Sequence, residues 1–253
     1  MMKNLVGIIL ILLLQGCASK KDIIYFGDAD NLVQSKINYK SPNIQINDIL
    51  DIKVSALIVE TALPYNFQTS AIVNTQTADY QKLQGYLVAS DGTITFPILG
   101  SIAVAGKSTK DVEKQIEQLL INGGHINNPT VRIRVINGKV TILGEVANPG
   151  TFNYSEENIT LPQAIGYAGD LTIRGKRNNI LIIREEDGVR SQQRVDFTKT
   201  TWFNSPYYYI KQNDIIVVEP NGPKVKSAGF VGDLGTFISV FSLALSTFLL
   251  IIR

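Results

Sequence analysis

The hydrophobic residues of this chain follow three patterns, with an apolar run near each end and short alternating segments between them. Apolar and polar residues that alternate at every second position are typical of half-buried β-strands. This alternation predicts strands within residues 48–54, 85–90, 93–96 and 129–135. Further strands are predicted within the strand-like segments 102–106, 140–146, 179–184, 193–197 and 215–218. Asp91-Gly92 separates two of these segments and predicts that they form a hairpin.

Two short helices are predicted among the strands, because apolar residues recur at helical spacing behind capping residues. The first begins at Ser108 or Thr109 and ends at Gly123. Its predicted apolar face consists of Val112, Ile116, Leu119 and Leu120. The second runs from Leu161 to Ala168 behind the cap residue Thr160. Strands with one helix in each of two small modules predict an α+β fold over residues 38–136 and 137–221.

The N-terminal run has the features of a lipoprotein signal peptide. Lys3 precedes an apolar stretch from Leu5 to Leu14, which is too short to cross a bilayer. The sequence Leu14-Gln15-Gly16-Cys17 resembles the lipobox of bacterial lipoproteins. We therefore expect a signal peptide over 1–16 and a lipidated tether over 17–37, with diacylglycerol and a further acyl chain on Cys17. An ordinary signal peptide with an incidental cysteine is the alternative.

The C-terminal run predicts a transmembrane helix over residues 234–253, after a linker over 222–233. Such a helix is about 28 Å long, close to the hydrocarbon thickness of a bilayer. Small residues recur at steps of three and four along this helix and therefore form a stripe on one of its faces: Gly232, Gly235, Ser239, Ser242 and Ser246. That face is predicted to line a pore or to contact sister helices. The alternative is a simple anchor whose serines bond back to their own helix.

Composition excludes several classes of function. The 253 residues carry a net charge of only +2, so nucleic acid is not an expected partner. One histidine, His125, and one cysteine cannot form a typical zinc site, and no nucleophile motif is present. The pairs Glu156-Glu157 and Glu185-Glu186 have the spacing of solvent-exposed turns. The chain is therefore predicted not to be an enzyme and to need no cofactor beyond its lipid.

An aromatic cluster near residue 205 could contact a glycan or a neighbouring subunit. Its members are Trp202, Tyr207, Tyr208 and Tyr209. Sugars stack on aromatic faces, but amphipathic rings also pack half-buried without any ligand. Ordinary packing is the favoured interpretation.

Motifs in a fixed order resemble the outer-membrane polysaccharide export proteins, which are subunits of capsule and exopolysaccharide translocons. The export-domain motifs are Asp48-Ile49-Leu50-Asp51-Ile52-Lys53-Val54, Ser90-Asp91-Gly92-Thr93-Ile94, Phe96-Pro97-Ile98-Leu99-Gly100 and Val104-Ala105-Gly106-Lys107-Ser108. The second module resembles a soluble-ligand-binding β-grasp domain through Gly144-Glu145-Val146, Asn148-Pro149-Gly150, Ala164-Ile165, Ala168-Gly169 and Asn213-Asp214. The chain departs from the family at Ile46-Asn47-Asp48, where Pro-Gly-Asp is usual.

The resemblance implies a homo-oligomeric ring that exports polysaccharide from the periplasm to the cell surface. The ring would be anchored in the outer membrane, with most of the protein in the periplasm. An inner-membrane co-polymerase or tyrosine kinase would be its partner. The main alternative is a lipid-anchored glycan-binding or scaffold protein without a pore. A periplasmic hydrolase and an inner-membrane location for the last helix also stay open.

Overall fold

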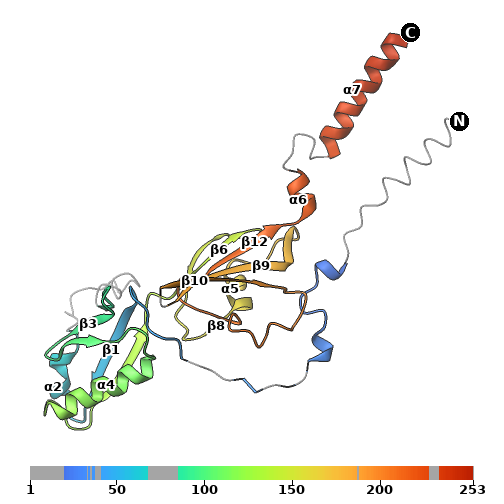
Figure 1. Ribbon diagram of the computed structural model, residues 1–253. Coiled ribbons are helices and arrows are strands. Elements are labelled where there is room, and N and C mark those ends of the chain that lie inside the picture. Colours follow the sequence, from blue (N-terminus) through green and yellow to red (C-terminus); the bar gives the residue numbers. More distant parts are fainter. Residues whose placement is uncertain are drawn as a thin grey trace.

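The computed structural model describes residues 20–32, 34, 36–37, 41–67, 85–186, 188–227 and 234–252. The predicted signal peptide over 1–16, the predicted acylation site Cys17 and the stripe residue Gly232 lie outside the described residues. The described chain forms two β-rich modules in succession, followed by two helices (Figure 1). The mixed, β-rich architecture agrees with the predicted fold class.

The first module is built around strand β1 (Ile49–Ser55). This strand is central in a three-stranded antiparallel sheet, between β2 (Tyr86–Leu87) and β5 (Thr130–Val135). Helix α4 (Thr109–Asn122) packs beside β5, and the short helices α2 (Val59–Ala62) and η3 (Leu63–Tyr65) follow β1. The side chains that alternate inward along β1 form its part of the core: Leu50, Ile52 and Val54.

Helix α4 confirms the predicted cap. The Ser108 side chain accepts a hydrogen bond from the Asp111 N–H, which satisfies one of the free donors at the helix start. Val112, Ile116 and Leu120 are fully buried. Leu119 is 39% exposed, so the buried face is narrower than the sequence predicted.

The predicted hairpin across Asp91-Gly92 is wrong. A tight turn does form there, with the Gly92 N–H donating to the Ala89 carbonyl at 2.9 Å. The flanking segments nevertheless pair elsewhere: β2 pairs with β1, and β3 (Thr93–Phe96) pairs with β4 (Gly100–Ala103). The alternation of polar and apolar residues in a strand shows which of its faces is buried. It does not identify the neighbouring strand, because tertiary contacts determine the pairing.

The second module holds a five-stranded mixed sheet in the order β10-β9-β12-β6-β7. Its strands are β6 (Lys139–Gly144), β7 (Gly150–Asn153), β9 (Gly175–Glu186), β10 (Val189–Val195) and β12 (Ile215–Pro220). The central strand β12 is parallel to β6 and antiparallel to β9. Helix α5 (Leu161–Tyr167) begins with the predicted cap, a capping box between Thr160 and Gln163. A small pair, β8 (Ile159–Thr160) with β11 (Tyr209–Ile210), lies next to α5.

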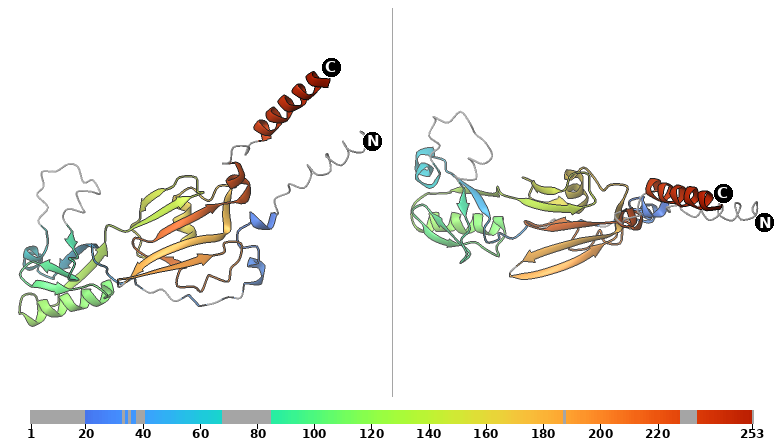
Figure 2. Two further views of the ribbon diagram at one scale, coloured as in Figure 1. Left: turned by 45° about the horizontal axis from the view of Figure 1, so that its top comes forward. Right: turned by 90° about the horizontal axis from the view of Figure 1, so that it is seen from above.

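The segment predicted as a tether packs against the second module. It contains the short turns η1 (Lys20–Asp22) and η2 (Ala29–Asn31). The Phe26 and Gly27 N–H groups donate to the carbonyls of Phe197 and Thr198 at 2.9 and 2.8 Å. The Phe26 ring joins the aromatic cluster, 6.0 Å from Phe197 and 5.2 Å from Phe203. Burial of these rings holds the segment beside the sheet (Figure 2).

The C-terminal region contains helices α6 (Gly222–Ser227), within the predicted linker, and α7 (Leu234–Ile252). Helix α7 projects away from the second module (Figures 1 and 2). No helix among the described residues has the length and hydropathy needed to cross a membrane, so the predicted transmembrane helix is not confirmed. The Ser239 hydroxyl donates to the Gly235 carbonyl at 2.5 Å, and Ser246 donates to Leu243 at 2.8 Å.

Gly144 is required where β6 meets β12. Its φ is +92°, and a Cβ there would lie 2.0 Å from the Val218 carbonyl oxygen. We expect Gly144→Ala to lower the free energy of unfolding by about 3 kcal/mol or more, from backbone strain and overpacking together. Chemical denaturation would measure this.

Gly188 provides the matched control, because its φ is +76° but no atom lies within 4 Å of the position that a Cβ would take. Gly188→Ala should cost only about 1–2 kcal/mol, the strain of a left-handed alanine alone. Equal losses from the two substitutions would contradict the close approach of β12.

Candidate functional site

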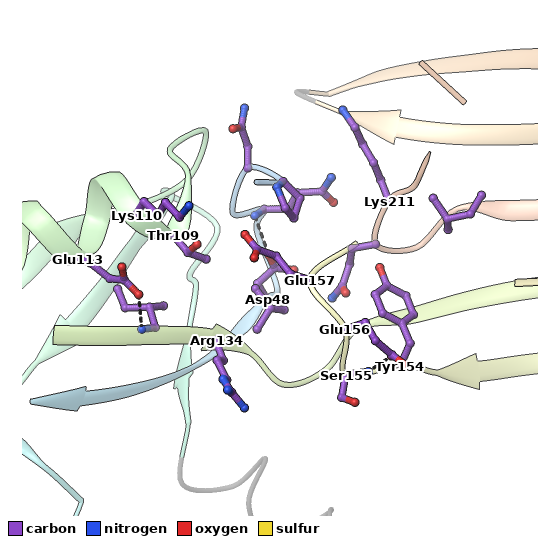
Figure 3. Close-up of a pocket in the computed structure, with 18 of the residues that line it drawn as sticks. Asp48, Thr109, Lys110, Glu113, Arg134, Tyr154, Ser155, Glu156, Glu157 and Lys211 are labelled. Carbon is purple, nitrogen blue, oxygen red and sulfur yellow. Dashed lines mark hydrogen bonds between the residues drawn. The ribbon is translucent and has the colours of Figure 1, made fainter. Parts of the chain in front are cut away.

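A pocket of about 390 Å³ with a mixed polar and apolar lining lies between the two modules (Figure 3). Small-molecule sites commonly occupy about 300–1,000 Å³. The first module contributes Asp48, Thr109, Lys110, Glu113, Arg132 and Arg134, and the second contributes Tyr154, Ser155, Glu156, Glu157, Ile210, Lys211 and Gln212. The pocket therefore depends on the contact between the export-like module and the module that follows it.

Asp48 is the most deeply buried charged residue that lines this pocket. It lies directly before β1 and is 2% exposed. The Gln45 N–H donates to Asp48 Oδ2 at 2.8 Å. Asp48 Oδ1 is buried and has no hydrogen-bond partner in the part of the chain that the structure describes. Burial raises the pKa of Asp48 to about 6, and the Gln45 N–H only partly opposes this.

The second module repeats this turn at Asp214, which lies directly before β12. Asn213 has φ +63° and Asn47 has φ +70°, so both turns pass through the left-handed region before the acid. The Lys211 N–H donates to Asp214 Oδ2 at 2.9 Å, as Gln45 does to Asp48. Each acid thus opens the central strand of its own sheet with the same local geometry.

The two acids differ in their second partner. Arg184, from β9, donates to Asp214 Oδ1 at 2.9 Å and to Oδ2 at 2.7 Å. Its remaining donors reach the Pro206 and Tyr209 carbonyls at 3.0 and 2.9 Å. Both side chains of this ion pair are almost fully buried, at 4% and 1% exposure. Asp48 has no such guanidinium, and its Oδ1 atom is buried without a hydrogen-bond donor among the described residues.

Tyr154 brings a phenol to the same pocket. Burial, and then the nearby carboxylates of Asp214 and Asp48, raise the pKa of Tyr154 well above its ordinary value. The hydroxyl therefore stays protonated at every physiological pH and can donate a hydrogen bond. Its ring adds an apolar face beside the polar groups of the lining (Figure 3).

The charges around the pocket are balanced in sign. Four cationic side chains and four carboxylates line it. Some already have partners: Glu113 accepts the Ile133 N–H at 2.8 Å, and Lys211 pairs with Glu186. The side chains of Lys110, Arg134 and Glu157 have no hydrogen bond or ion pair to another described residue. The pocket thus offers both donors and acceptors to a ligand.

The predicted aromatic cluster lies elsewhere, in the core of the second module. Trp202 is 7% exposed, stacks on Phe197 at 4.9 Å, and donates to the Lys199 carbonyl. Tyr207 lies under the Arg184 guanidinium at 4.7 Å, and Tyr208 packs 5.7 Å from Trp202. Tyr209 meets Tyr208 edge-on at 5.0 Å. The packing accounts for Trp202, and a glycan or subunit contact by these four residues stays a prediction.

The other candidate residues add no reactive centre to the pocket. His125 is exposed beyond the end of α4, and its ring meets Tyr65 edge-on at 6.0 Å. Within the described ranges, no group of three or more His, Cys, Asp or Glu side chains could hold a metal ion. The stripe on α7 does not contribute to the pocket, and sequence reasoning missed the pocket altogether. The one available signal was the repeated Asn-Asp-Ile at residues 47–49 and 213–215.

Comparison with known proteins now identifies the class. Residues 38–136 match the family described as "Polysaccharide biosynthesis/export protein", and residues 139–194 match the SLBB domain. The pocket lies where these two domains meet. These two matches support the polysaccharide export protein family, as the motifs indicated.

Two curated relatives carry the same printed name, "EPS I polysaccharide export outer membrane protein EpsA". The protein from Ralstonia nicotianae is 32% identical over 106 residues, and the one from Ralstonia solanacearum is 30% identical over 104. Each match covers 40% of this chain and 27% of the relative. The chain thus spans about a quarter of the length of these relatives.

Breaking the Arg184–Asp214 pair should strongly destabilise the protein. Arg184→Met would leave a buried carboxylate without its cation, at an expected cost of about 3–5 kcal/mol in chemical denaturation. The double variant Arg184→Met with Asp214→Asn removes the charge as well and should recover part of this loss. A single-variant loss below about 1 kcal/mol would contradict the role of the pair.

Asp48 should make stability depend on pH. Its folded pKa of about 6 is above the ordinary 3.8, so its contribution to stability is full below the ordinary pKa and is lost as the pH rises through 6. Asp48→Asn should therefore stabilise the protein at about pH 7.5 by about 2–3 kcal/mol. The gain should disappear at about pH 2.5, below the ordinary pKa, where the carboxyl group is protonated in both states.

Chemical denaturation at the two pH values tests this. Asp51→Asn is the matched control, because the Asp51 side chain is 38% exposed in the same segment. It should change stability little at either pH. Destabilisation by Asp48→Asn at the higher pH would instead mean that a cation satisfies Asp48 in the folded protein.

Proposed function

We propose that this chain is a subunit of an oligomeric outer-membrane channel that exports capsular polysaccharide or exopolysaccharide. The observation that carries the proposal is the order of its two domains, an export domain followed directly by an SLBB domain. The printed name of the two relatives supports the same cargo and the same membrane. The protein acts by forming a passage, and translocation needs no bond chemistry from this chain.

Two attachments to the membrane support an assembled structure rather than a simple tether. Acylation at Cys17 would anchor the N-terminus, with most of the protein in the periplasm. Helix α7 exposes large apolar side chains that need a lipid or protein neighbour, among them Ile238, Leu243 and Leu250, at 57%, 68% and 80% exposure. Sister copies of α7 would cover this surface and line the pore.

The small-residue face of α7 is suited to contact between copies. Gly235, Ser239, Ser242 and Ser246 would let two helices approach closely. The hydroxyls of Ser239 and Ser246 bond to their own helix, which keeps them satisfied before assembly. Identical subunits in head-to-tail contact close into a ring when the rotation permits it. An inner-membrane co-polymerase or tyrosine kinase would then supply energy and gating.

The second candidate is a lipid-anchored glycan-binding or scaffold protein without a pore. The pocket between the domains favours it, because a binding protein needs a ligand site and a passage does not. The two functions differ in assembly, so oligomeric state separates them.

Imaging and mass measurement of the detergent-extracted, full-length protein test the proposal. We expect closed rings, and we expect Ser239→Arg or Ser242→Arg to dissociate them and stop polymer secretion. Ser239→Ala and Ser242→Ala keep the face small and should leave rings and secretion unchanged. A monomer, or rings and secretion that tolerate both arginines, would overturn the channel. Membrane fractionation checks the outer-membrane location.

A further inference from the structure

We propose that the end of the second module farthest from the first module binds a lipid surface with anionic headgroups (Figure 1). This end is called the terminal surface, and three segments of the chain form it: Lys21, Ile173, Arg174, Lys224, Val225 and Lys226. The inference rests on the proposed function for the presence of a membrane. It adds a surface through which the folded body contacts that membrane, besides the proposed attachment at Cys17.

Hydrogen bonds hold the three segments of the terminal surface together. The Asn221 N–H donates to the Arg174 carbonyl at 2.7 Å, which joins the start of α6 to the turn before β9. The Asn221 side chain also accepts the Lys224 N–H at 3.1 Å. The N-terminal segment is fixed beside the same turn, because the Tyr25 hydroxyl donates to Asp170 at 2.5 Å and η1 contacts β9. The terminal surface is therefore a defined part of the fold.

The terminal surface lies close to both proposed membrane attachments. Lys21 follows the predicted acylation site Cys17 by four residues, so the two are at most about 14 Å apart. Seven residues lead from Ser227, the end of α6, to Leu234 at the start of α7, which span at most about 25 Å. A membrane that holds the acyl chains is therefore within reach of this end of the module.

Two large aliphatic side chains on the terminal surface are exposed. Ile173 is 65% exposed on the turn before β9, and Val225 is 58% exposed on α6. Single exposed aliphatic residues are common and need no partner. These two lie on adjoining segments, and both have cationic neighbours in the sequence. Apolar side chains flanked by cations are typical of protein surfaces that lie in the interface of a bilayer.

The cations of the terminal surface are available to a partner. Lys21, Arg174 and Lys226 are exposed, and their side chains form no hydrogen bond or ion pair with another described residue. Lys224 lies 3.8 Å from Glu145 in an exposed pair, which contributes little in water. A lysine or arginine near an anionic leaflet strengthens membrane binding about fivefold.

The carboxylates at this end are fewer and most have partners. Glu145 accepts the Thr172 hydroxyl at 2.9 Å, and Asp170 accepts the Tyr25 hydroxyl. Within the three segments, Asp22 is the one carboxylate without a hydrogen bond or ion pair to a described residue. The unpaired charge at this end is therefore mainly positive, which fits anionic headgroups.

Hydrogen–deuterium exchange of the full-length, acylated protein in lipid nanodiscs tests the proposal. One set of discs contains phosphatidylethanolamine alone, and the other contains about one part phosphatidylglycerol to three parts of it. We expect amide exchange in residues 171–176 and 222–227 to be about fivefold slower with phosphatidylglycerol. This difference should disappear at about 0.5 M salt, which screens charges beyond a few ångströms.

Charge reversal separates the terminal surface from a general effect of protein charge. Arg174→Glu with Lys226→Glu should abolish the dependence on phosphatidylglycerol. The matched control is Lys53→Glu with Lys114→Glu, because these exposed cations lie on the first module and the change in net charge is the same. The control should keep the full dependence, and its loss in both double variants would contradict a local contact.

Removing the aliphatic side chains tests the other half of the surface. Ile173→Ser with Val225→Ser should speed exchange of the same residues in both kinds of disc, since insertion between headgroups does not require anionic lipid. Leu57→Ser is the control, because Leu57 is 95% exposed on the first module. It should leave exchange at the terminal surface unchanged.

The outcomes distinguish this proposal from the channel. Closed rings whose terminal surface exchanges equally in the two lipids would overturn the lipid contact and leave the channel standing. Protection that depends on ring assembly but not on phosphatidylglycerol would also overturn it, because a sister copy would then cover the surface. Protection that depends on phosphatidylglycerol in a protein that stays monomeric would overturn the channel and support the lipid contact.

Discussion

A buried carboxylate before the central strand of each domain is the constraint on which the rest of the structure depends. Removing a carboxylate from water is expensive unless hydrogen bonds and a counter-charge replace the lost solvent. Asp214 meets this cost with one backbone N–H and the Arg184 guanidinium, which also ties β9 to the loop around Pro206. Among the described residues, Asp48 has the N–H alone. The two domains therefore bury a carboxylate in the same turn, but among the described residues only Asp214 also has a counter-charge.

The carboxylate with fewer partners, Asp48, lies where the two domains meet. The Arg184 pair is enclosed within the second domain, so its energy stabilises that domain alone. The Asp48 carboxylate lines the pocket, with Tyr154 of the other domain close enough for both acids to raise the pKa of its phenol. Charge at Asp48 is thus linked to the junction between the domains, and not only to the first core.

The sequence was sufficient for elements whose signals are local. Ser108 and Thr160 cap their helices as predicted, and alternation located β1 and β5. It was insufficient for pairing: the turn at Asp91-Gly92 forms, but β2 pairs back to β1 across a long stretch of chain while β3 pairs forward to β4. The pocket could not be predicted either, since it combines Asp48 with residues of the following domain. Similarly, Phe26 gave no signal that it would pack beside Phe197.

An acid that is buried without a full set of partners lowers the stability of the free protein, and the repeated turn shows that the fold can supply those partners. Arg184 reaches Asp214 from a neighbouring strand, and Lys110 and Arg134 line the same pocket as Asp48 without forming an ion pair to a described residue. Strain and unsatisfied groups of this kind occur where a protein must interact with something else. The wall of the pocket comes from both domains, so the charge on Asp48 acts on Tyr154 of the SLBB domain as well as on the core of its own domain.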